Sequence, residues 1–295
     1  MNIKTLYGKI LGSMSSLLGV DFAKKFDTRL RFHRTLNLKA PTSLADKVTY
    51  LELHKQSQLA SICTDKYAVR EYIRKKGLED ILIPVVGGPW SSVEDVDFDG
   101  LPDKFALKAT HGCKMNYLVA DKSELDYPKC KAEMQRWLET KYGSYSMEPH
   151  YLSIPHRIYA EEYLADAAQL TDYKFHCLNG EPQFVLTVSD RKTDGDKGMS
   201  LQLNMFDMNW NPIDKIVSYK KECAGNGNIS KPKTFDRMVE IAKILSKDFD
   251  FVRVDLYERN DAVLFGELTF SPGCCVFPYF TQDFLNDMGR KLQLS

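Results

Sequence analysis

Two neighbouring stretches near the end of the chain, Phe251–Tyr257 and Val263–Phe270, constrain the fold more than any other part of the sequence. Both stretches read as β-strands and flank a short polar turn, which predicts a β-hairpin. Side chains alternate across a strand, so Arg253 and Asp255 share one face of the first strand. If the connecting loop has an odd number of residues, Asp255 lies directly opposite Glu267. That register also keeps most aliphatic residues on the other face, which a slip by one residue would not.

Two facing carboxylates need a shared proton or a cation between them. Directly opposed residues have Cβ atoms about 4.5–5.5 Å apart. Two carboxylates at that distance repel by about 3 kcal/mol at an intermediate effective dielectric. Mg²⁺ is usually held by one or two carboxylates plus substrate phosphates. Asp255 and Glu267 are therefore a candidate magnesium site, and the alternative is a solvated hairpin face on which Arg253 pairs with one of the two acids.

Composition excludes several classes of protein. The 295 residues can bury a large core in one lobed domain or two. Lysine plus arginine and aspartate plus glutamate each number 40, so nothing favours bulk electrostatic binding of nucleic acid. No run approaches the roughly 18 apolar residues of a membrane span. The N-terminal patch Ile10–Val20 is a poor signal peptide and reads as an amphipathic helix, with peripheral membrane contact as a minor alternative.

The cysteines indicate a cytoplasmic protein. There are seven, an odd number, and none are arranged as CxxC. This argues against a disulfide framework and against a zinc site, and favours a reduced compartment.

The first 62 residues look helical, and a further helix follows. Ser43, with Asp46 three residues later, is a plausible helix start. Thr64 could cap the next helix. Lys66 would then lie in the first turn of that helix, where the helix dipole disfavours a cation. The lysine is therefore either simply solvated or directed toward an anion.

A lysine in the middle of a predicted strand is the next clue. The strand Phe105–Ala109 places Lys108 on its less apolar face. A central-strand lysine is more often functional or paired than free. The turn that follows contains Gly112 and could cover phosphates through its backbone N–H groups. Neither GxxxxGK[ST] nor GxGxxG is present, so this turn is a weak signal by itself.

Two more predicted strands carry charged residues. Residues 158–164 include the adjacent acids Glu161 and Glu162, one of which must face inward if the strand is buried on both sides. The hairpin at residues 172–191 places three polar residues on one face: Asp172, Lys174 and His176. We interpret His176 as structural, since no second histidine lies at metal-ligand spacing.

Taken together, these motifs resemble the ATP-grasp superfamily. Their order along the chain is DK (65–66), FALKATHG (105–112), AEEYL (160–164), DYKF (172–175), RVDLY (253–257) and GELTFSPG (266–273). Within the superfamily the chain resembles the TupA-like branch, which is associated with bacterial surface-polysaccharide and teichuronopeptide genes. The resemblance implies an α+β fold in which two lobes grip ATP between antiparallel sheets, with a helical N-terminal region.

The implied organisation has three parts. They are an N-terminal helical region with a connector, a small ATP-gripping lobe and a larger catalytic lobe, at residues 1–103, 104–164 and 165–295.

The resemblance also implies roles in ATP binding. Lys66 and Lys108 would hold the phosphates, with Gly112 and its neighbours as a closing flap. Glu161 or Glu162 would accept a hydrogen bond from the adenine amino group. The adenine edge would meet the backbone of Glu162, Tyr163 and Leu164.

The remaining implied roles concern the metal and the substrate. Mg²⁺ bridging the β- and γ-phosphates would be bound by Asp255 and Glu267. Thr269 stands where the superfamily usually has asparagine, and it would be a weaker metal ligand. Three further residues complete the implied site: Asp172 at the ribose hydroxyls, Lys174 at a phosphate or a substrate carboxylate, and Arg253 at the phosphorylated intermediate.

The implied activity is that of an ADP-forming carboxylate–amine ligase that uses an acyl-phosphate intermediate. Its partners would be a small-molecule or glycan carboxylate, such as a uronic acid, and an amine or amino acid, with peripheral association with a glycan-assembly complex. Three alternatives stay open. They are a kinase that phosphorylates a glycan hydroxyl, a glycosyltransferase that uses the DxD-like stretch at residues 95–99, and an ATP-binding protein without turnover.

Overall fold

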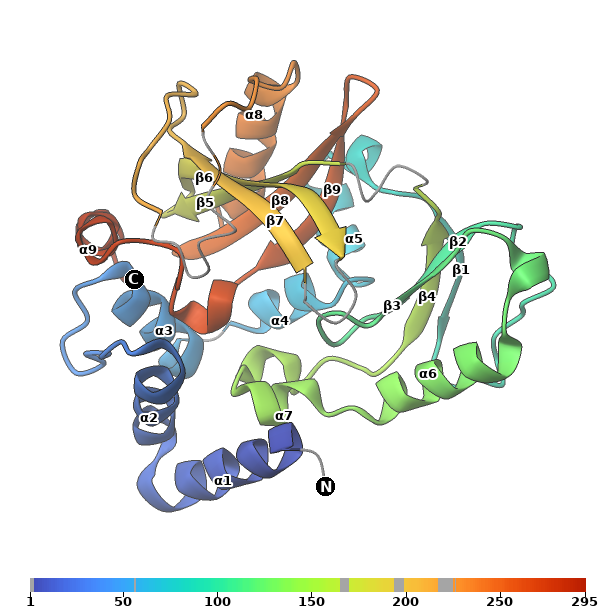
Figure 1. Cartoon of the computed structure of the whole chain (residues 1–295), viewed down its shortest axis with the longest axis horizontal. Helices are drawn as coiled ribbons and strands as arrows, with labels where there is room; N and C mark the ends of the chain where they lie inside the picture. The colour runs from blue at the N-terminus through green and yellow to red at the C-terminus, as the bar shows by residue number, and fades with distance from the viewer. Residues whose placement is uncertain (1–2, 56, 165–169, 194–198, 217–224, 226) are drawn as a thin grey trace. The chain divides into compact units, whose positions relative to one another are not determined.

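The computed structural model describes residues 3–55, 57–164, 170–193, 199–216, 225 and 227–295 (Figure 1). The chain divides into two compact units, which we call the larger unit (residues 1–56 and 168–295) and the smaller unit (residues 57–167). Each unit contains an antiparallel sheet with helices, so the expected α+β class is confirmed.

The boundaries of these units differ from the three parts expected from the sequence. Residues 57–103 fold with the expected small lobe, and residues 1–56 fold with the C-terminal part of the chain. The expected boundary after residue 164 adjoins residues 165–169, which lie outside the described residues.

The smaller unit is built on a four-stranded antiparallel sheet in the order β1-β4-β2-β3. In chain order its main elements are α4 (Gln58–Thr64), α5 (Val69–Lys75), β1 (Val85–Trp90), β2 (Phe105–Ala109), β3 (Asn116–Val119), α6 (Tyr127–Glu139), α7 (Tyr142–Ser146) and β4 (Ile158–Glu162).

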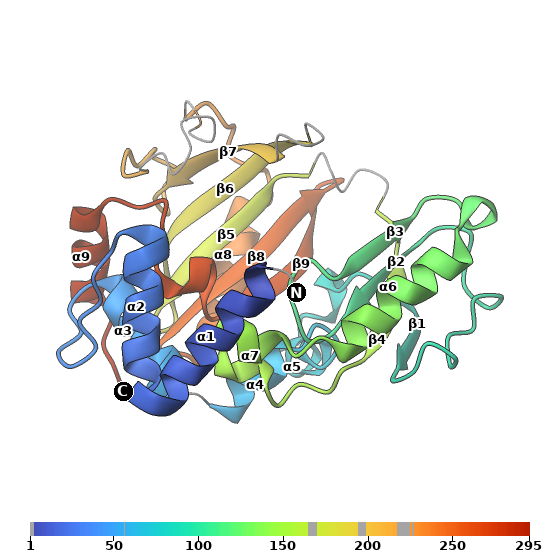
Figure 2. The same cartoon turned by 60° about the horizontal axis from the view of Figure 1, so that its bottom comes forward.

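Helix α6 covers one face of the smaller sheet (Figure 2). The helix begins at Asp126, whose carboxylate accepts a hydrogen bond from the Lys129 backbone N–H at 3.0 Å. Its buried residues recur at helical spacing and pack against alternate residues of β2 and β4: Cys130, Met134 and Trp137 against Phe105, Leu107, Ile158 and Ala160. The other face of β2 and β4 is left for polar side chains.

The larger unit is built on a five-stranded antiparallel sheet in the order β7-β6-β5-β8-β9. In chain order its main elements are α1 (Ile3–Leu18), α2 (Val20–Phe32), α3 (Leu44–His54), β5 (Asp172–Leu178), β6 (Glu181–Thr193), β7 (Met199–Phe206), α8 (Phe235–Ser246), β8 (Phe251–Arg259), β9 (Ala262–Thr269) and α9 (Gln282–Lys291).

The two faces of the larger sheet are covered differently. Helix α8 packs on one face, where the Phe235 ring lies 5.9 Å from that of Phe175. On the opposite face, α3 and α9 join a core with one end of the strands, including Leu178, Phe251 and Phe284. The other end of that face carries the charged residues, so only half of it is used for packing.

Helix α3 starts where the sequence predicted it. Ser43 accepts a hydrogen bond from the Asp46 N–H, and the Asp46 carboxylate accepts one from the Ser43 N–H, which together form a capping box. A buried ion pair joins this helix to α2, since the Lys24 ammonium lies 2.9 Å from the Glu52 carboxylate. Both helices are thereby fixed to the larger unit.

The predicted helix start at Thr64 is wrong. Thr64 is the last residue of α4, and its hydroxyl donates to the Ala60 carbonyl at 2.8 Å. The Asp65 carboxylate instead accepts hydrogen bonds from the Tyr67 and Ala68 N–H groups, and α5 begins only afterwards. Lys66 therefore precedes the helix. The turn-rich segment after α5 also contains a strand, β1, that the sequence did not reveal.

Candidate functional site

Strands β8 and β9 bring Asp255 and Glu267 directly opposite one another, as predicted. The assumed odd-numbered loop is wrong. The connection is a two-residue turn, Asn260 and Asp261, with φ of 52° and 60°, which is typical of a type I′ hairpin. A bulge at Gly266 adds one residue to β9 and shifts the register by one. The predicted pairing is therefore right because two departures from the assumed geometry cancel.

Arg253 binds both acids of this pair. Its guanidinium donates to both oxygens of Asp255, at 2.6 and 2.7 Å, and to Glu267 at 3.2 Å. It also donates to the Thr269 hydroxyl at 3.0 Å. Bidentate guanidinium–carboxylate contacts fix the orientation of both groups as well as their charge. The four residues thus form one continuous network across β8 and β9.

Lys174 on β5 adds a second cation. It pairs with Asp255 across the β5–β8 ladder, and its ammonium forms an ion pair with that carboxylate. The ammonium also lies 3.1 Å from the Asp172 carboxylate. We call the resulting set the charged cluster. It consists of Asp172, Lys174, Arg253, Asp255 and Glu267, and it sets three carboxylates against two cationic groups.

The two facing acids differ in exposure. The side chain of Asp255 is 2% exposed, and that of Glu267 is 38% exposed. Burial lowers the pKa of Arg253, but the adjacent Asp255 carboxylate more than offsets this and holds the pKa above its ordinary value. Burial also raises the pKa of Tyr257 well above 10, and its hydrogen bond to Asp172 adds to this. The charged cluster therefore contains a fully charged guanidinium, and the Tyr257 phenol beside it is neutral.

The oxygen donors of this site fit Mg²⁺. Asp255 and Glu267 offer carboxylate oxygens and Thr269 offers a hydroxyl, and hard oxygen ligands are those that Mg²⁺ prefers. Within the described part of the chain, no three His, Cys, Asp or Glu side chains come together as metal ligands. Two carboxylates are what the protein supplies where substrate phosphates complete the coordination.

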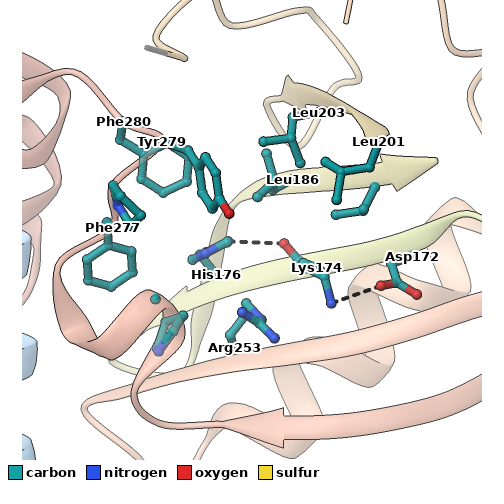
Figure 3. Close-up of a pocket in the computed structure, with 14 residues that line it drawn as sticks. Asp172, Lys174, His176, Leu186, Leu201, Leu203, Arg253, Phe277, Tyr279 and Phe280 are labelled. Carbon is teal, nitrogen blue, oxygen red and sulfur yellow. Dashed lines mark hydrogen bonds and ion pairs between the residues drawn. The ribbon is translucent and has the colours of Figure 1, made fainter. Parts of the chain in front are cut away.

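A cavity of ≈ 320 Å³ adjoins the charged cluster (Figure 3). Asp172, Lys174 and Arg253 line one part of it. Across the β5–β6 ladder, Lys174 pairs with Leu186 and Asp172 pairs with Val188. The same sheet face therefore changes from charged to aliphatic within one strand.

His176 lies at this boundary and is buried. Its ring stacks on Phe184 at 4.3 Å and meets Phe280 edge-on at 5.7 Å. Burial, together with the nearby charges of Arg253 and Lys174, lowers the pKa of His176 well below 6.5. The imidazole is therefore neutral, and the structural role expected for it agrees with its packing.

In the smaller unit, Lys108 forms an ion pair with Glu161 on the polar face of the sheet. The Tyr159 hydroxyl donates to the same carboxylate at 3.0 Å, and the Arg70 guanidinium lies 3.8 Å away. Glu161 is buried and Glu162 is exposed, so Glu161 is the acid that faces inward.

Lys66 and Gly112 also meet in the smaller unit. The Lys66 ammonium donates to the Gly112 carbonyl at 2.7 Å, and the Lys66 N–H donates to the Thr110 carbonyl at 3.2 Å. A Cβ on Gly112 would lie only 2.9 Å from the Met115 sulfur, so the turn is closely packed there. The predicted phosphate lysine and the predicted flap glycine are thus in direct contact.

The predicted adenine-binding residues follow the end of β4. The Glu162 N–H donates to the Pro84 carbonyl at 2.9 Å. Tyr163 and Leu164 come after the last strand residue and are half-buried.

Sequence reasoning missed Arg70 and Tyr159. Arg70 is only 7% exposed, which is unusual for an arginine. It lies on the short helix α5, beside Val69 and near Ile73. An arginine next to the apolar stripe of a helix was the available signal, because buried arginines are nearly always paired. Tyr159 shares a strand face with Glu161, which alternation alone could have shown.

Two antiparallel α+β units, one with a lysine–glutamate pair at its sheet centre and one with opposed acids, are the arrangement expected of the ATP-grasp class. The model of the TupA-like ATP-grasp family matches residues 46–292, and the chain belongs to that family. No curated protein matches the sequence significantly.

Several solved ATP-grasp structures resemble the chain at low identity. D-alanine–D-alanine ligase from Helicobacter pylori has a TM-score of 0.47 and 13% identity over 85% of this chain and 69% of that one. The Bacillus anthracis ligase has a TM-score of 0.43 and 14% identity over 72% of this chain, which spans only 58% of that ligase. The ATP-grasp ligase PsnB with Mg and ADP has a TM-score of 0.42 and 14% identity, over 80% of this chain and 60% of PsnB. The family match, and not these likenesses, supports the assignment.

Proposed function

We propose that this protein is an ADP-forming carboxylate–amine ligase that works through an acyl phosphate. The observation that carries the proposal is the opposed pair Asp255 and Glu267, with Arg253 donating to both. A pair of acids beside a guanidinium suits a magnesium–triphosphate next to a carboxylate substrate. Membership of the TupA-like ATP-grasp family supports the same chemistry.

The smaller unit would bind ATP. Lys66 and Lys108 would contact the phosphates, since both ammonium groups are already directed at oxygen acceptors. Gly112 and its neighbours would cover the phosphates through backbone N–H groups. The buried Glu161 would hold Lys108 in place or accept the adenine amino proton. The adenine edge would meet the backbone of Glu162, Tyr163 and Leu164.

The larger unit would bind the metal and the reacting groups. Asp255 and Glu267, with the weaker ligand Thr269, would bind Mg²⁺, which would offset the charge of the triphosphate. Asp172 would hold the ribose hydroxyls. Lys174 and Arg253 would orient the substrate carboxylate and stabilise the charge that develops during phosphoryl transfer.

The reaction would run in two steps. A carboxylate oxygen attacks the γ-phosphorus, the bond to the bridging β–γ oxygen breaks, and ADP leaves. An amine then attacks the acyl carbon, inorganic phosphate leaves, and the amine loses a proton to give the amide. Arg253 and Lys174 lie on one sheet face and would stay beside the phosphorylated carboxylate through both steps.

The acceptor would be a carboxylated sugar of a surface polysaccharide, acted on in the cytoplasm. Association with a peripheral glycan-assembly complex is supported by apolar residues exposed on α1 and α2. Leu17 is 82% exposed, and Phe22 and Phe26 are 49% and 41% exposed. None of the described helices is long and apolar enough to cross a membrane.

Product analysis tests the proposal. The protein is incubated with ATP, Mg²⁺, a uronic acid and a mixture of amino acids. ADP and an amide of the expected mass would support the ligase, whereas AMP would contradict it. A stable phosphate ester would indicate a kinase. Stabilisation by UDP-sugars but not by ATP with Mg²⁺ in a thermal-shift assay would indicate a glycosyltransferase.

A further inference from the structure

The cavity beside the charged cluster has walls of two kinds. Four aliphatic residues of β6 and β7 form one wall: Leu186, Val188, Leu201 and Leu203. The chain that follows β9 supplies an opposite wall of aromatic rings and prolines, which includes Phe277, Tyr279 and Phe280 (Figure 3). Among the described residues that line the cavity, the charged ones lie at the end formed by β5 and β8.

The apolar walls do not suit a sugar. Hydroxyl groups that lose water need hydrogen-bond partners, and each one left unpaired weakens binding. The aliphatic and phenylalanine side chains of these walls offer none, and the Tyr279 hydroxyl is a polar group at the edge of the aromatic wall. His176, which lies between the charged end and the rings, is neutral because burial lowers its pKa. The inner part of the cavity therefore suits an uncharged hydrocarbon group.

The charged end presents positively and negatively charged side chains that are close enough together to contact one small ligand. The ammonium of Lys174 and the guanidinium of Arg253 face the cavity together with the Asp172 carboxylate. The Lys174 nitrogen lies 3.1 Å from an Asp172 oxygen. A ligand with a carboxylate and an ammonium on neighbouring atoms matches such an end.

The size of the cavity suits one residue. At ≈ 320 Å³ it stands at the lower limit of ligand pockets, which span about 300–1,000 Å³. That volume accommodates a single amino acid with its side chain.

We propose that this cavity binds an α-amino acid with an apolar side chain of leucine or phenylalanine size. The side chain lies between the β6–β7 wall and the rings of Phe277 and Phe280, and the zwitterion meets Lys174, Arg253 and Asp172. In this assignment Asp172 binds the amino group of the amino acid instead of the ribose hydroxyls of ATP. This inference rests on the proposed ligase function, because the amino acid would be one of the two substrates that the ligase joins.

Direct binding tests the inference without turnover. Calorimetry uses the whole protein, with and without Mg²⁺ and a non-hydrolysable ATP analogue. Leucine and phenylalanine bind about tenfold or more tightly than serine and glucuronic acid, because the apolar pocket discriminates by its contact area. 4-Methylpentanoate lacks the ammonium of leucine and isopentylamine lacks its carboxylate, and both bind more weakly than leucine. Equal affinity for leucine and serine in both states overturns the inference, and so does equal affinity for leucine and 4-methylpentanoate.

A matched pair of variants tests the location. Leu201 and Leu264 are both half-buried leucines on edge strands of the same sheet, but only Leu201 lines the cavity. Leu201→Asn reduces the preference for leucine over serine by about tenfold, and Leu264→Asn leaves it unchanged. Leu186→Ala is a second cavity variant, which enlarges the cavity and shifts the preference toward phenylalanine. Unchanged preferences in both folded cavity variants overturn the location.

The two proposals fail differently. If ATP with Mg²⁺ does not bind but leucine still binds selectively, the ligase function fails and the amino-acid site stands. If ADP is released with all amino acids alike, the ligase function stands and the apolar site fails.

Discussion

Asp255 and Glu267 lie opposite one another only because a bulge at Gly266 corrects the register set by the two-residue turn. A side chain has no room at this bulge. A Cβ on Gly266 would lie 2.9 Å from the Tyr257 ring and 3.0 Å from the Asp255 carbonyl oxygen. The geometry of the acid pair therefore depends on a glycine that contributes no functional group.

We expect Gly266→Ala to destabilise the protein by about 1–3 kcal/mol, because a packed ladder must shift to admit the methyl group. Urea denaturation measures this change. Gly12→Ala is the matched control, since nothing lies within 4 Å of a Cβ there, and alanine in a helix interior is favoured by about 0.5–1 kcal/mol. Equal stabilities of Gly266→Ala and the wild type would show that the bulge tolerates a side chain.

Substitutions of the two acids should change the stability of the protein by different amounts. Asp255 is buried against two cations, so Asp255→Asn should cost about 3–5 kcal/mol by leaving both without their shared carboxylate. Glu267 is 38% exposed, so Glu267→Gln should change stability by less than about 1 kcal/mol.

Turnover should respond to both substitutions. Loss of a direct metal ligand should reduce ADP formation by about 100-fold or more, since changes to the residues around metal ligands alone cost 10–100-fold. The decisive measurement is ADP release by Glu267→Gln, a variant that should stay folded. A Glu267→Gln protein with wild-type turnover at limiting Mg²⁺ would exclude Glu267 as a ligand.

Lys108 and Glu161 should be coupled energetically. Lys108→Met and Glu161→Gln each remove one partner of the ion pair, so the double variant should lose less stability than the two single losses added together. The expected coupling is about 0.5–3 kcal/mol, measured by a double-mutant cycle in urea.

ATP binding should depend on the lysine as well. Lys108→Met should raise the KM for ATP, whereas Lys104→Met, an exposed lysine just before β2, should not. If the two stability losses are additive and the KM for ATP is unchanged in Lys108→Met, Lys108 does not contact the phosphates of ATP.

Local alternation made much of the charged face predictable. Asp172, Lys174 and His176 share a face because strand periodicity needs no knowledge of the rest of the chain. The same rule paired Asp255 with Glu267. The correct pairing was predicted with an incorrect loop length, because the spacing of apolar residues does not reveal a bulge.

Contacts between distant elements were not predictable in this way. Arg70 approaches Glu161 only because the start of α5 lies beside this part of the smaller sheet, which no local pattern specifies. Asp65 rather than Thr64 caps the turn before α5, since both residue types are good caps and the choice depends on where α4 ends. The apolar cavity was missed for the same reason, because its wall after β9 is distant in sequence from β6 and β7.

The stability of the smaller unit should depend on pH through His111. Its ring nitrogen Nε2 lies 2.9 Å from the Trp137 carbonyl, and the ring stacks on His156 at 3.8 Å. Burial lowers the pKa of His111 from 6.5 to about 4. Between pH 6.5 and 4 the unfolded chain therefore binds a proton at this site that the folded protein does not.

Acidification through this range therefore destabilises the folded protein. The free energy of unfolding should fall as the pH drops through this window, by up to about 1.4 kcal/mol per pH unit from this group. His111→Asn should reduce the slope in urea denaturation series at pH 6.5, 5.5 and 4.5. Ile158→Val removes a buried methyl group of the same unit and no proton site, so it should lower stability by about 0.5–1.5 kcal/mol at every pH and keep the slope. If His111→Asn and Ile158→Val have the same slope, the buried imidazole is not the group that titrates.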